Sequence, residues 1–445
     1  MSSRRQFIQT LGAGGATLAG LTACGGGSTS SNSGGSGGPP PPPPPPPVAA
    51  PILVLVQIQG GNDWLSMLPP TSGANAGAYL TNRPSLAAAL TTNNVTDLGG
   101  GYGLNKDCTG LDLIHAAGKI AWIPGLGMPN SNLSHFTATD FWGEGATSPD
   151  GTGWLGRWGD AAFAPTEVLR GITTTSDIML LNHGRKRDFV AITSSADFNY
   201  PTYLRSAAAV PDSNFLKSGY SYSLNNPGTV IDVSTAASEG KLFYDAASQF
   251  SNLIPPIPRT PSVPYPGDPT YPIANVSTQL ANQLKLVAQM IAAGIPGQVY
   301  TVRLGGFDTH SNQVNDYPRL MRALGGSITA FYNDLASINT TVNGATVKAQ
   351  DRVMVVGWSE FGRRIKENNG GTDHGTAILS FALGNVVKGG FYGQGYPDLT
   401  RPDPNGNMVF TTDFRSLYAT LLEKFLGYSD SKGILGSTYP TLGFL

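Results

Sequence analysis

Short apolar runs alternate with segments of helical periodicity along most of the chain. Five runs are apolar enough to predict strands that are buried on both faces of a sheet, at 52–58, 119–126, 299–304, 352–358 and 378–383. Helices separate several of these strands, and this alternation is typical of α/β proteins. We therefore expect a doubly wound, mostly parallel sheet with helices on both faces.

Two apolar stripes at helical spacing lie in the second half of the chain. One predicts a helix over 275–293, and the other, which includes Leu324 and Leu335, predicts a helix between strands 299–304 and 352–358. The second helix makes a strand–helix–strand unit. Because such crossovers are right-handed, both strands should end at the same edge of the sheet.

Periodicity is weaker in the middle of the chain, where aromatic residues and a proline-rich stretch accumulate. We expect residues 160–273, approximately, to form an inserted cap on the domain that spans 51–445. This region carries no recognisable motif, so it does not indicate a substrate.

The first 24 residues have the pattern of an export signal. A twin-arginine pair, Arg4-Arg5, precedes a short, mildly apolar segment that ends in Leu-Thr-Ala-Cys at Cys24. This order predicts transport by the twin-arginine translocase and a lipid anchor on Cys24, facing the periplasm or the cell surface. The absence of Asp after Cys24 favours the outer membrane. An ordinary signal peptide with an incidental cysteine is the alternative.

Residues 25–50 are expected to be a tether. Gly and Ser dominate its first part, and the nine prolines of 39–47 predict a polyproline II rod of about 28 Å at ~3.1 Å per residue. Lipidation of Cys24 would leave Cys108 as a lone thiol, since the chain has two cysteines. Charged residues make up 13% of the chain and the net charge is −1, so no nucleic-acid groove is expected.

Polar residues that could carry chemistry lie in the turns next to the predicted strands. The candidate metal ligands are Asp63, Asp308, His310, Glu360, Asp373 and His374. Carboxylates with imidazoles suit one or two divalent ions such as Zn²⁺, Mn²⁺, Mg²⁺ or Ca²⁺. For Asp63, a turn residue selected for its backbone conformation is an equal alternative.

The candidate catalytic residues are Ser134, His135, Thr137, Arg363 and Arg364. Ser134 or Thr137 could supply an attacking hydroxyl, although Ser134 could instead cap a helix. Arg363 or Arg364 could neutralise the oxygens of a phosphate or sulfate ester with a bidentate fork; surface salt bridges are the alternative.

Seven motifs occur in an order that resembles the bacterial exported family called domain of unknown function 1501. They are Gln59–Asp63, Asn132–Phe136, Thr152–Arg157, Leu304–His310, Ser359–Arg364, Gly370–Thr376 and Val387–Gly393. The family resembles a branch of the alkaline phosphatase and sulfatase superfamily, which implies an alkaline phosphatase-like fold and a metal-dependent hydrolase of phosphate or sulfate esters.

The resemblance to the superfamily admits two registers. In one, Asp373-His374-Gly375 matches the Asp-His-Gly metal motif of phosphatases. In the other, Ser359–Gly362 stands where sulfatases have Ser-Asp-Asn-Gly, and His374 supplies the later histidine. Asp63 would resemble the metal carboxylate of the first strand. Glu360 replaces the usual Asp, and the sulfatase nucleophile motif Cys/Ser-x-Pro-x-Arg is absent from the sequence.

The sequence thus predicts a lipid-anchored envelope hydrolase that acts on a small-molecule or polysaccharide ester. The alternative is a catalytically degenerate relative that binds a polysaccharide or a protein. The hydrolase hypothesis places Asp63, Asp308, His310, Glu360 and His374 around one metal site, facing Ser134 or Thr137.

Overall fold

A computed structural model describes residues 50–90, 94–146, 150–194 and 259–445. The export signal with Cys24, nearly all of the tether, and much of the expected cap lie outside these residues.

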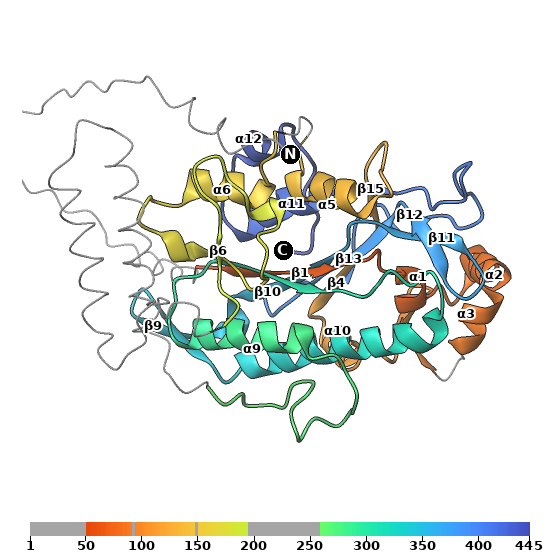
Figure 1. The fold of residues 1–445 in the computed structure, drawn as a ribbon, viewed down its shortest axis with the longest axis horizontal. Coiled ribbons are helices and arrows are strands. Elements are labelled where there is room, and N and C mark those ends of the chain that lie inside the picture. The colour runs from red at the N-terminus through yellow and green to blue at the C-terminus, as the bar shows by residue number, and fades with distance from the viewer. Residues whose placement is uncertain (1–49, 91–93, 147–149, 195–258) are drawn as a thin grey trace, which may run out of the picture. The chain divides into compact units, whose positions relative to one another are not determined.

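A mostly parallel sheet is the centre of the fold (Figure 1). Among the described residues it has nine strands, ordered β14-β4-β13-β10-β1-β7-β5-β6, with β15 also paired to β4. β13 runs antiparallel to both of its neighbours, and all other pairs are parallel. The strands are β1 (Ile52–Ile58), β4 (Ile120–Gly127), β5 (Gly171–Thr173), β6 (Val190–Ala191), β7 (Val299–Leu304), β10 (Val353–Trp358), β13 (Ile378–Leu383), β14 (Gly390–Phe391) and β15 (Thr412–Asp413).

Three hairpins lie outside this sheet. They are formed by β2 (Val95–Gly99) with β3 (Tyr102–Asn105), β8 (Asn339–Val342) with β9 (Ala345–Lys348), and β11 (Gly362–Glu367) with β12 (Thr372–Gly375). The β11–β12 hairpin connects the end of β10 to the start of β13, so it lies at the edge where β10 ends.

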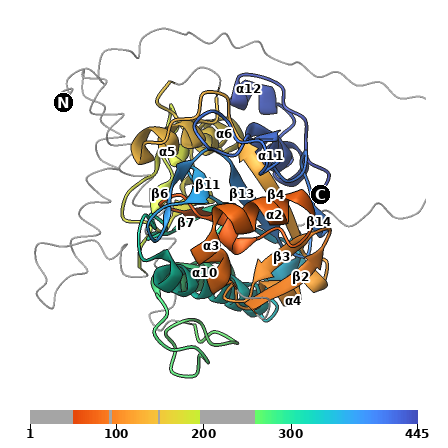
Figure 2. The ribbon, with the colours of Figure 1, turned by 90° about the vertical axis from the view of Figure 1, so that its right-hand side faces the viewer.

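Helices cover both faces of the sheet, as expected (Figures 1 and 2). One face carries α9 (Gln279–Ala292) and α10 (Gln313–Leu335). The other carries α5 (His135–Glu144), α6 (Trp154–Ala162), α11 (Arg415–Thr420), which continues as a π-helix over Leu421–Phe425, and α12 (Ser431–Leu435). The remaining helices are α1 (Trp64–Met67), α2 (Gly73–Asn82), α3 (Pro84–Ala89) and α4 (Leu111–Ala116).

Each face of the sheet has its own hydrophobic core, because side chains alternate along a strand. In β1, Val54 and Val56 pack into the core under α9 and α10, whereas Leu53 and Leu55 pack into the core under α6 and α11. All seven residues of β1 are buried. The continuous apolar run of this strand is therefore explained by burial on both sides.

Two features of the connectivity were not predicted from the sequence. β7 and β10 do not pair with each other but flank β1 on its two sides. Both are parallel to β1, so their carboxyl ends still share one edge. The first part of the expected cap, from residue 160, contributes β5 and β6 to the main sheet.

The helices of the described residues include none with the length and apolar character needed to cross a membrane.

Candidate metal centre

The polar turns after β1, β4, β7 and β10 meet at the carboxyl edge of the sheet. Because β13 is antiparallel, the residues that precede it, on β12, reach the same edge. Ligand sites in open α/β sheets occupy this edge. The turns thus bring together residues that are more than 200 positions apart, such as His135 and Glu360.

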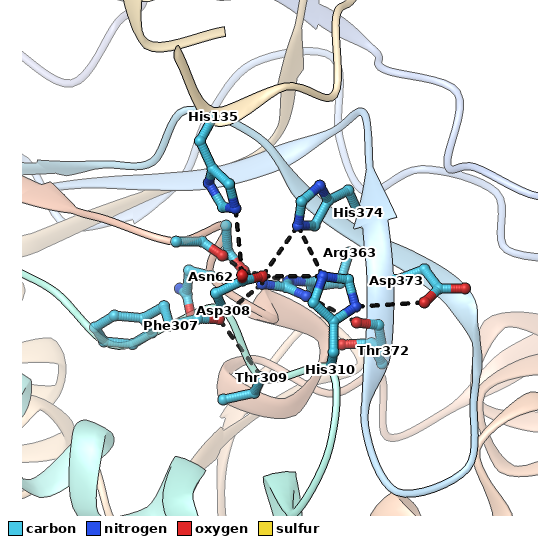
Figure 3. A network of polar contacts seen from close by, with 12 residues as sticks. Asn62, His135, Phe307, Asp308, Thr309, His310, Arg363, Thr372, Asp373 and His374 are labelled. Carbon is cyan, nitrogen blue, oxygen red and sulfur yellow. Dashed lines mark hydrogen bonds and ion pairs between the residues drawn. The ribbon is translucent and has the colours of Figure 1, made fainter.

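Asp308, in the turn after β7, is the centre of the cluster (Figure 3). Its Oδ1 lies 3.0 Å from His374 Nε2 and 3.1 Å from His310 Nε2, and its Oδ2 lies 3.3 Å from His135 Nε2. Asp308 and His310 are each 44% exposed, so the cluster opens to solvent on one side.

The other ring nitrogen of each histidine faces an oxygen atom. Nδ1 of His135 lies 2.9 Å from Glu360 Oε1, Nδ1 of His374 lies 2.8 Å from the carbonyl oxygen of Leu133, and Nδ1 of His310 lies 3.4 Å from Asp373 Oδ1. A neutral imidazole donates from one ring nitrogen only, and both nitrogens of each ring face an oxygen, so a proton on Nδ1 leaves Nε2 as a free acceptor.

With the protons on Nδ1, three Nε2 lone pairs are directed at the Asp308 carboxylate. His310 Nε2 and His374 Nε2 are also only 3.0 Å apart. Lone pairs that face one another repel unless a proton or a cation lies between them. The arrangement matches metal-binding histidines, which donate the other ring N–H to a carboxylate or a backbone carbonyl.

The spacing of these atoms suits one ion. One ligand atom each from His135, Asp308 and His374 can be chosen so that all three lie within 4.8 Å of one another. Ligands at about 2.1 Å from a tetrahedral ion are about 3.4 Å apart, so small side-chain movements would complete the site. Imidazole with carboxylate is a donor set for Zn²⁺ or Mn²⁺. Cys108 cannot contribute a thiolate here, because it is buried and packs against Met321.

The charges around the cluster favour a cation. Burial raises the pKa of Asp308, but its contacts with His374 and Arg363 outweigh this effect and hold the pKa well below the usual range. Burial lowers the pKa of His374, which disfavours its protonated form. The hydrogen bond with Glu360 raises the pKa of His135, so a proton on this ring would compete with an ion for the same nitrogen.

Glu360 supports the cluster and is not placed as a ligand itself. Its side chain is fully buried, and Oε1 accepts a hydrogen bond from the Gly60 N–H at 2.8 Å as well as facing His135. Asp373 has a similar place beside His310, and its other contact is a hydrogen bond from Asn368 at 3.0 Å. The sequence predicts both residues as ligands. In the structure they instead contact the Nδ1 atoms of His135 and His310.

Arg363 is enclosed rather than free to hold a substrate. Its guanidinium is fully buried and donates to Asp308 Oδ1 at 2.8 Å. It also donates to backbone carbonyls, those of Gly60, Gly61, Phe307 and Thr372. The structure thus does not leave the Arg363 guanidinium open to a substrate, as the sequence prediction requires; here it positions Asp308.

The turn after β1 has to be glycine for this enclosure to form. Gly60 and Gly61 have φ of +116° and +76°, which disfavour any side chain. A Cβ on Gly60 would lie 2.5 Å from the Asp308 nitrogen, and one on Gly61 would overlap the Phe361 ring. These two residues let the turn approach both the Asp308 backbone and the Arg363 side chain.

Asp63, the ligand expected from the first strand, lies in a separate buried network. Its carboxylate forms an ion pair with Arg83 at 2.7 Å and accepts hydrogen bonds from Ser66 at 2.6 Å and from Gln313. Asp63 and Arg83 are 1% and 0% exposed. The structure thus does not bring Asp63 into the cluster, because Arg83, between α2 and α3, supplies a cation that pairs with it.

Arg364, Ser134 and Thr137 lie close to the cluster in the chain. Arg364 is partly exposed, and its positive charge helps to lower the pKa of Asp373 after the larger effects of the Asn368 and His310 contacts. Ser134 is exposed and directly precedes His135 at the start of α5, where its side chain makes no capping hydrogen bond. Thr137 is half-buried in the first turn of the same helix.

Comparison with known proteins matches part of the chain to a protein family. No curated protein matches the chain. Residues 266–425, which carry Asp308, His310, Glu360 and His374, match the family described as protein of unknown function (DUF1501), and this match supports the resemblance to that family.

Proposed function

We propose that the protein is a metal-dependent hydrolase of phosphate or sulfate esters, with an alkaline phosphatase-like domain. The observation that carries the proposal is the convergence of three histidine Nε2 atoms on Asp308, each with its Nδ1 facing an oxygen. His135, His374 and Asp308 would hold the ion, with His310 beside them. When bound, a divalent ion supplies Lewis-acid stabilisation of the negative charge that develops on the ester oxygens.

The residues around the cluster have separate roles in this proposal. Glu360, Asp373 and the Leu133 carbonyl orient the imidazoles, and Arg363 orients Asp308. Ser134 is the candidate nucleophile, because it is exposed and directly precedes His135. Arg364 is the candidate to bind the anionic group of the ester, because the donors of Arg363 are used within the protein.

Metal content is the first test of the proposal. Purified wild-type protein should retain about one divalent ion per chain, and Asp308→Asn should lose most of it, because the amide no longer offers a charged ligand. His183→Ala is the matched control, since His183 pairs with Asp188 away from the cluster. Inductively coupled plasma mass spectrometry measures both. Equal metal content in wild type and Asp308→Asn would contradict the proposed site.

Turnover is the second test. Wild-type protein loaded with Zn²⁺ or Mn²⁺ should hydrolyse aryl phosphate or aryl sulfate esters, and Ser134→Ala should keep the metal while losing at least about 100-fold in kcat if Ser134 is the nucleophile. Thr137→Val tests the other hydroxyl in the same way. Loss in Thr137→Val but not in Ser134→Ala would reassign the nucleophile.

One observation favours a binding module instead. Arg363 is buried and donates to Asp308 and to backbone carbonyls. Of the two arginines that the sequence predicts for this role, Arg364 alone would then neutralise the charge of the ester. A protein that retains metal but hydrolyses neither ester class would support the degenerate relative that binds a polysaccharide or a protein.

We also propose export by the twin-arginine translocase and anchoring through Cys24, on the sequence pattern of residues 1–24. Cys24→Ala should move the protein from the membrane fraction to the soluble fraction, as measured by fractionation and immunoblotting. Retention of this variant at the wild-type level would rule out the lipid anchor.

A further inference from the structure

A cavity lies beside the last part of α5, away from the metal centre. It has a volume of about 330 Å³ and is lined by the loop after β4, the last part of α5 and the start of α11, including Met128, Phe141, Glu144, Phe414 and Arg415. Glu144 follows His135 by nine positions on this helix, which is about 13 Å at 1.5 Å per residue. The cavity is therefore separate from the proposed metal ligands, and its volume is at the lower end for small-molecule sites.

Glu144 gives this cavity a negative charge that the protein does not balance directly. The residue is 7% exposed, and its carboxylate accepts a hydrogen bond from the Gly151 N–H at 3.2 Å. Within the described residues, no ion pair includes its carboxylate. Burial raises the pKa of Glu144, and the Gly151 N–H and the charge of Arg157 offset this effect only in part.

The two arginines near Glu144 are engaged elsewhere. Arg157 is buried and donates to the carbonyls of Thr152, Ile434 and Glu144 itself, all of them backbone groups. Arg415 forms a bidentate pair with Asp413, with donor–acceptor distances of 2.8 and 2.6 Å. The positive charge of Arg415, which lines the cavity, is thus paired with the carboxylate of Asp413. Glu144 has no ion-pair partner of this kind among the described residues.

The remaining walls of the cavity suit a cation with an apolar shell. Phe141 contributes a partly exposed aromatic ring and Met128 a thioether, which are polarizable surfaces. The ring of Phe414 is buried and already faces Arg415. Aromatic rings attract organic ammonium ions through the negative face of the ring. An inorganic cation would instead need several oxygen ligands, whereas Glu144 is the sole carboxylate in the lining of this cavity.

We propose that this cavity binds a small organic ammonium group, with Glu144 as its counter-ion and Phe141 as its aromatic wall. Such a group could belong to a free amine or to part of a larger molecule; the shared chemistry is an alkylated ammonium of a size that fits about 330 Å³.

Calorimetric titration of the metal-free protein with choline tests the site without any turnover. Choline should bind once per chain, and Glu144→Gln should weaken binding by at least about tenfold, because the amide keeps the acceptor for Gly151 but not the charge. 3,3-Dimethylbutan-1-ol, the neutral carbon analogue of choline, should bind at least about tenfold more weakly than choline.

Two further variants separate the site from general effects. Asp112→Asn on α4 makes the same change in net charge and should leave choline binding unchanged. Phe141→Leu should weaken binding severalfold by removing the aromatic wall, and it keeps the proposal testable if Glu144→Gln does not fold. The proposal is overturned if wild-type protein binds no choline, if it binds the neutral analogue equally well, or if Phe141→Leu and Glu144→Gln both bind as wild type does.

Discussion

At the scale of single residues, the site depends on which atom of each histidine is free. His135, His310 and His374 all use Nδ1 toward an oxygen and leave Nε2 toward Asp308. Two of the three acceptors are the side chains of Glu360 and Asp373, and the third is a backbone carbonyl. The carbonyl of Leu133 could not be inferred from sequence, because every residue has one.

Asp63 illustrates the limit of residue-level inference at the same edge. The sequence shows a carboxylate after a strand beside paired glycines, which is equally typical of a ligand and of a turn. Its partner Arg83 is 20 positions away on a different element, and no spacing rule connects the two. His135, in contrast, is predicted from the sequence as a catalytic residue, and its position at the start of α5, after β4, places it among the candidate ligands.

We expect Asp63→Asn to destabilise the protein without removing the metal site. The change leaves the buried Arg83 charge without its partner, which costs about 3–5 kcal/mol in the free energy of unfolding. Urea unfolding followed by tryptophan fluorescence measures this cost, and metal content per folded chain should stay near the wild-type value. Loss of metal with little loss of stability would restore Asp63 as a ligand.

At the scale of elements, the buried strands and the shared direction of β7 and β10 could be predicted, but the reversal of β13 could not. Buried strands are continuous apolar runs, so β1, β4, β7, β10 and β13 were all anticipated within one or two residues. An apolar run does not encode direction, and the reversal of β13 follows from the β11–β12 hairpin, which returns the chain to the same edge. β5 and β6 have three and two residues, too few for a pattern.

The turn after β1 allows a prediction with an internal control. Gly61→Ala should destabilise the protein and weaken metal binding, because the new methyl group meets the Phe361 ring in a turn whose carbonyls hold Arg363. Gly73 has a similar φ of +71° but open space around its Cβ, so Gly73→Ala should cost only about 1–2 kcal/mol of backbone strain. Thermal unfolding and metal titration compare the two variants. Equal effects of the two changes would show that close packing at Gly61 has no role.

At the scale of the whole molecule, Asp334 links the segment that begins at Arg259 to helix α10. Its fully buried carboxylate on α10 accepts hydrogen bonds from Arg259 at 2.7 and 2.6 Å, and from the Ser262 N–H and hydroxyl at 2.7 and 2.8 Å. Burial raises the pKa of Asp334, but these bonds outweigh burial and lower it below the usual 3.8.

This lowered pKa predicts a loss of stability in acid. A carboxylate whose pKa is lower in the folded state contributes stability that is present above its unfolded pKa and is lost as the pH falls through the folded pKa. Asp334→Asn should therefore destabilise the protein at pH 7, by on the order of 3 kcal/mol, and make the free energy of unfolding less pH-dependent below about pH 4.

Urea unfolding at several pH values between 7 and 2 measures this effect. Asp316→Asn on the same helix is the control, because its ion pair with Arg319 is exposed and long at 3.8 Å, and it should cost about 1 kcal/mol or less. A pH profile of Asp334→Asn that parallels the wild type would show that other carboxylates dominate acid unfolding.

The position of β1 has a consequence for the order in which the protein can fold. This strand leaves the ribosome first among the strands of the sheet, yet its partners β7 and β10 are synthesised more than 200 residues later. At about 5–20 residues per second, the gap between Ile58 and Leu304, the end of β7, corresponds to about 12–50 s, during which this strand has no native neighbour in the sheet. Chains that stop before β7 cannot bury this strand in its native place, so premature termination should produce material that depends on chaperones or aggregates.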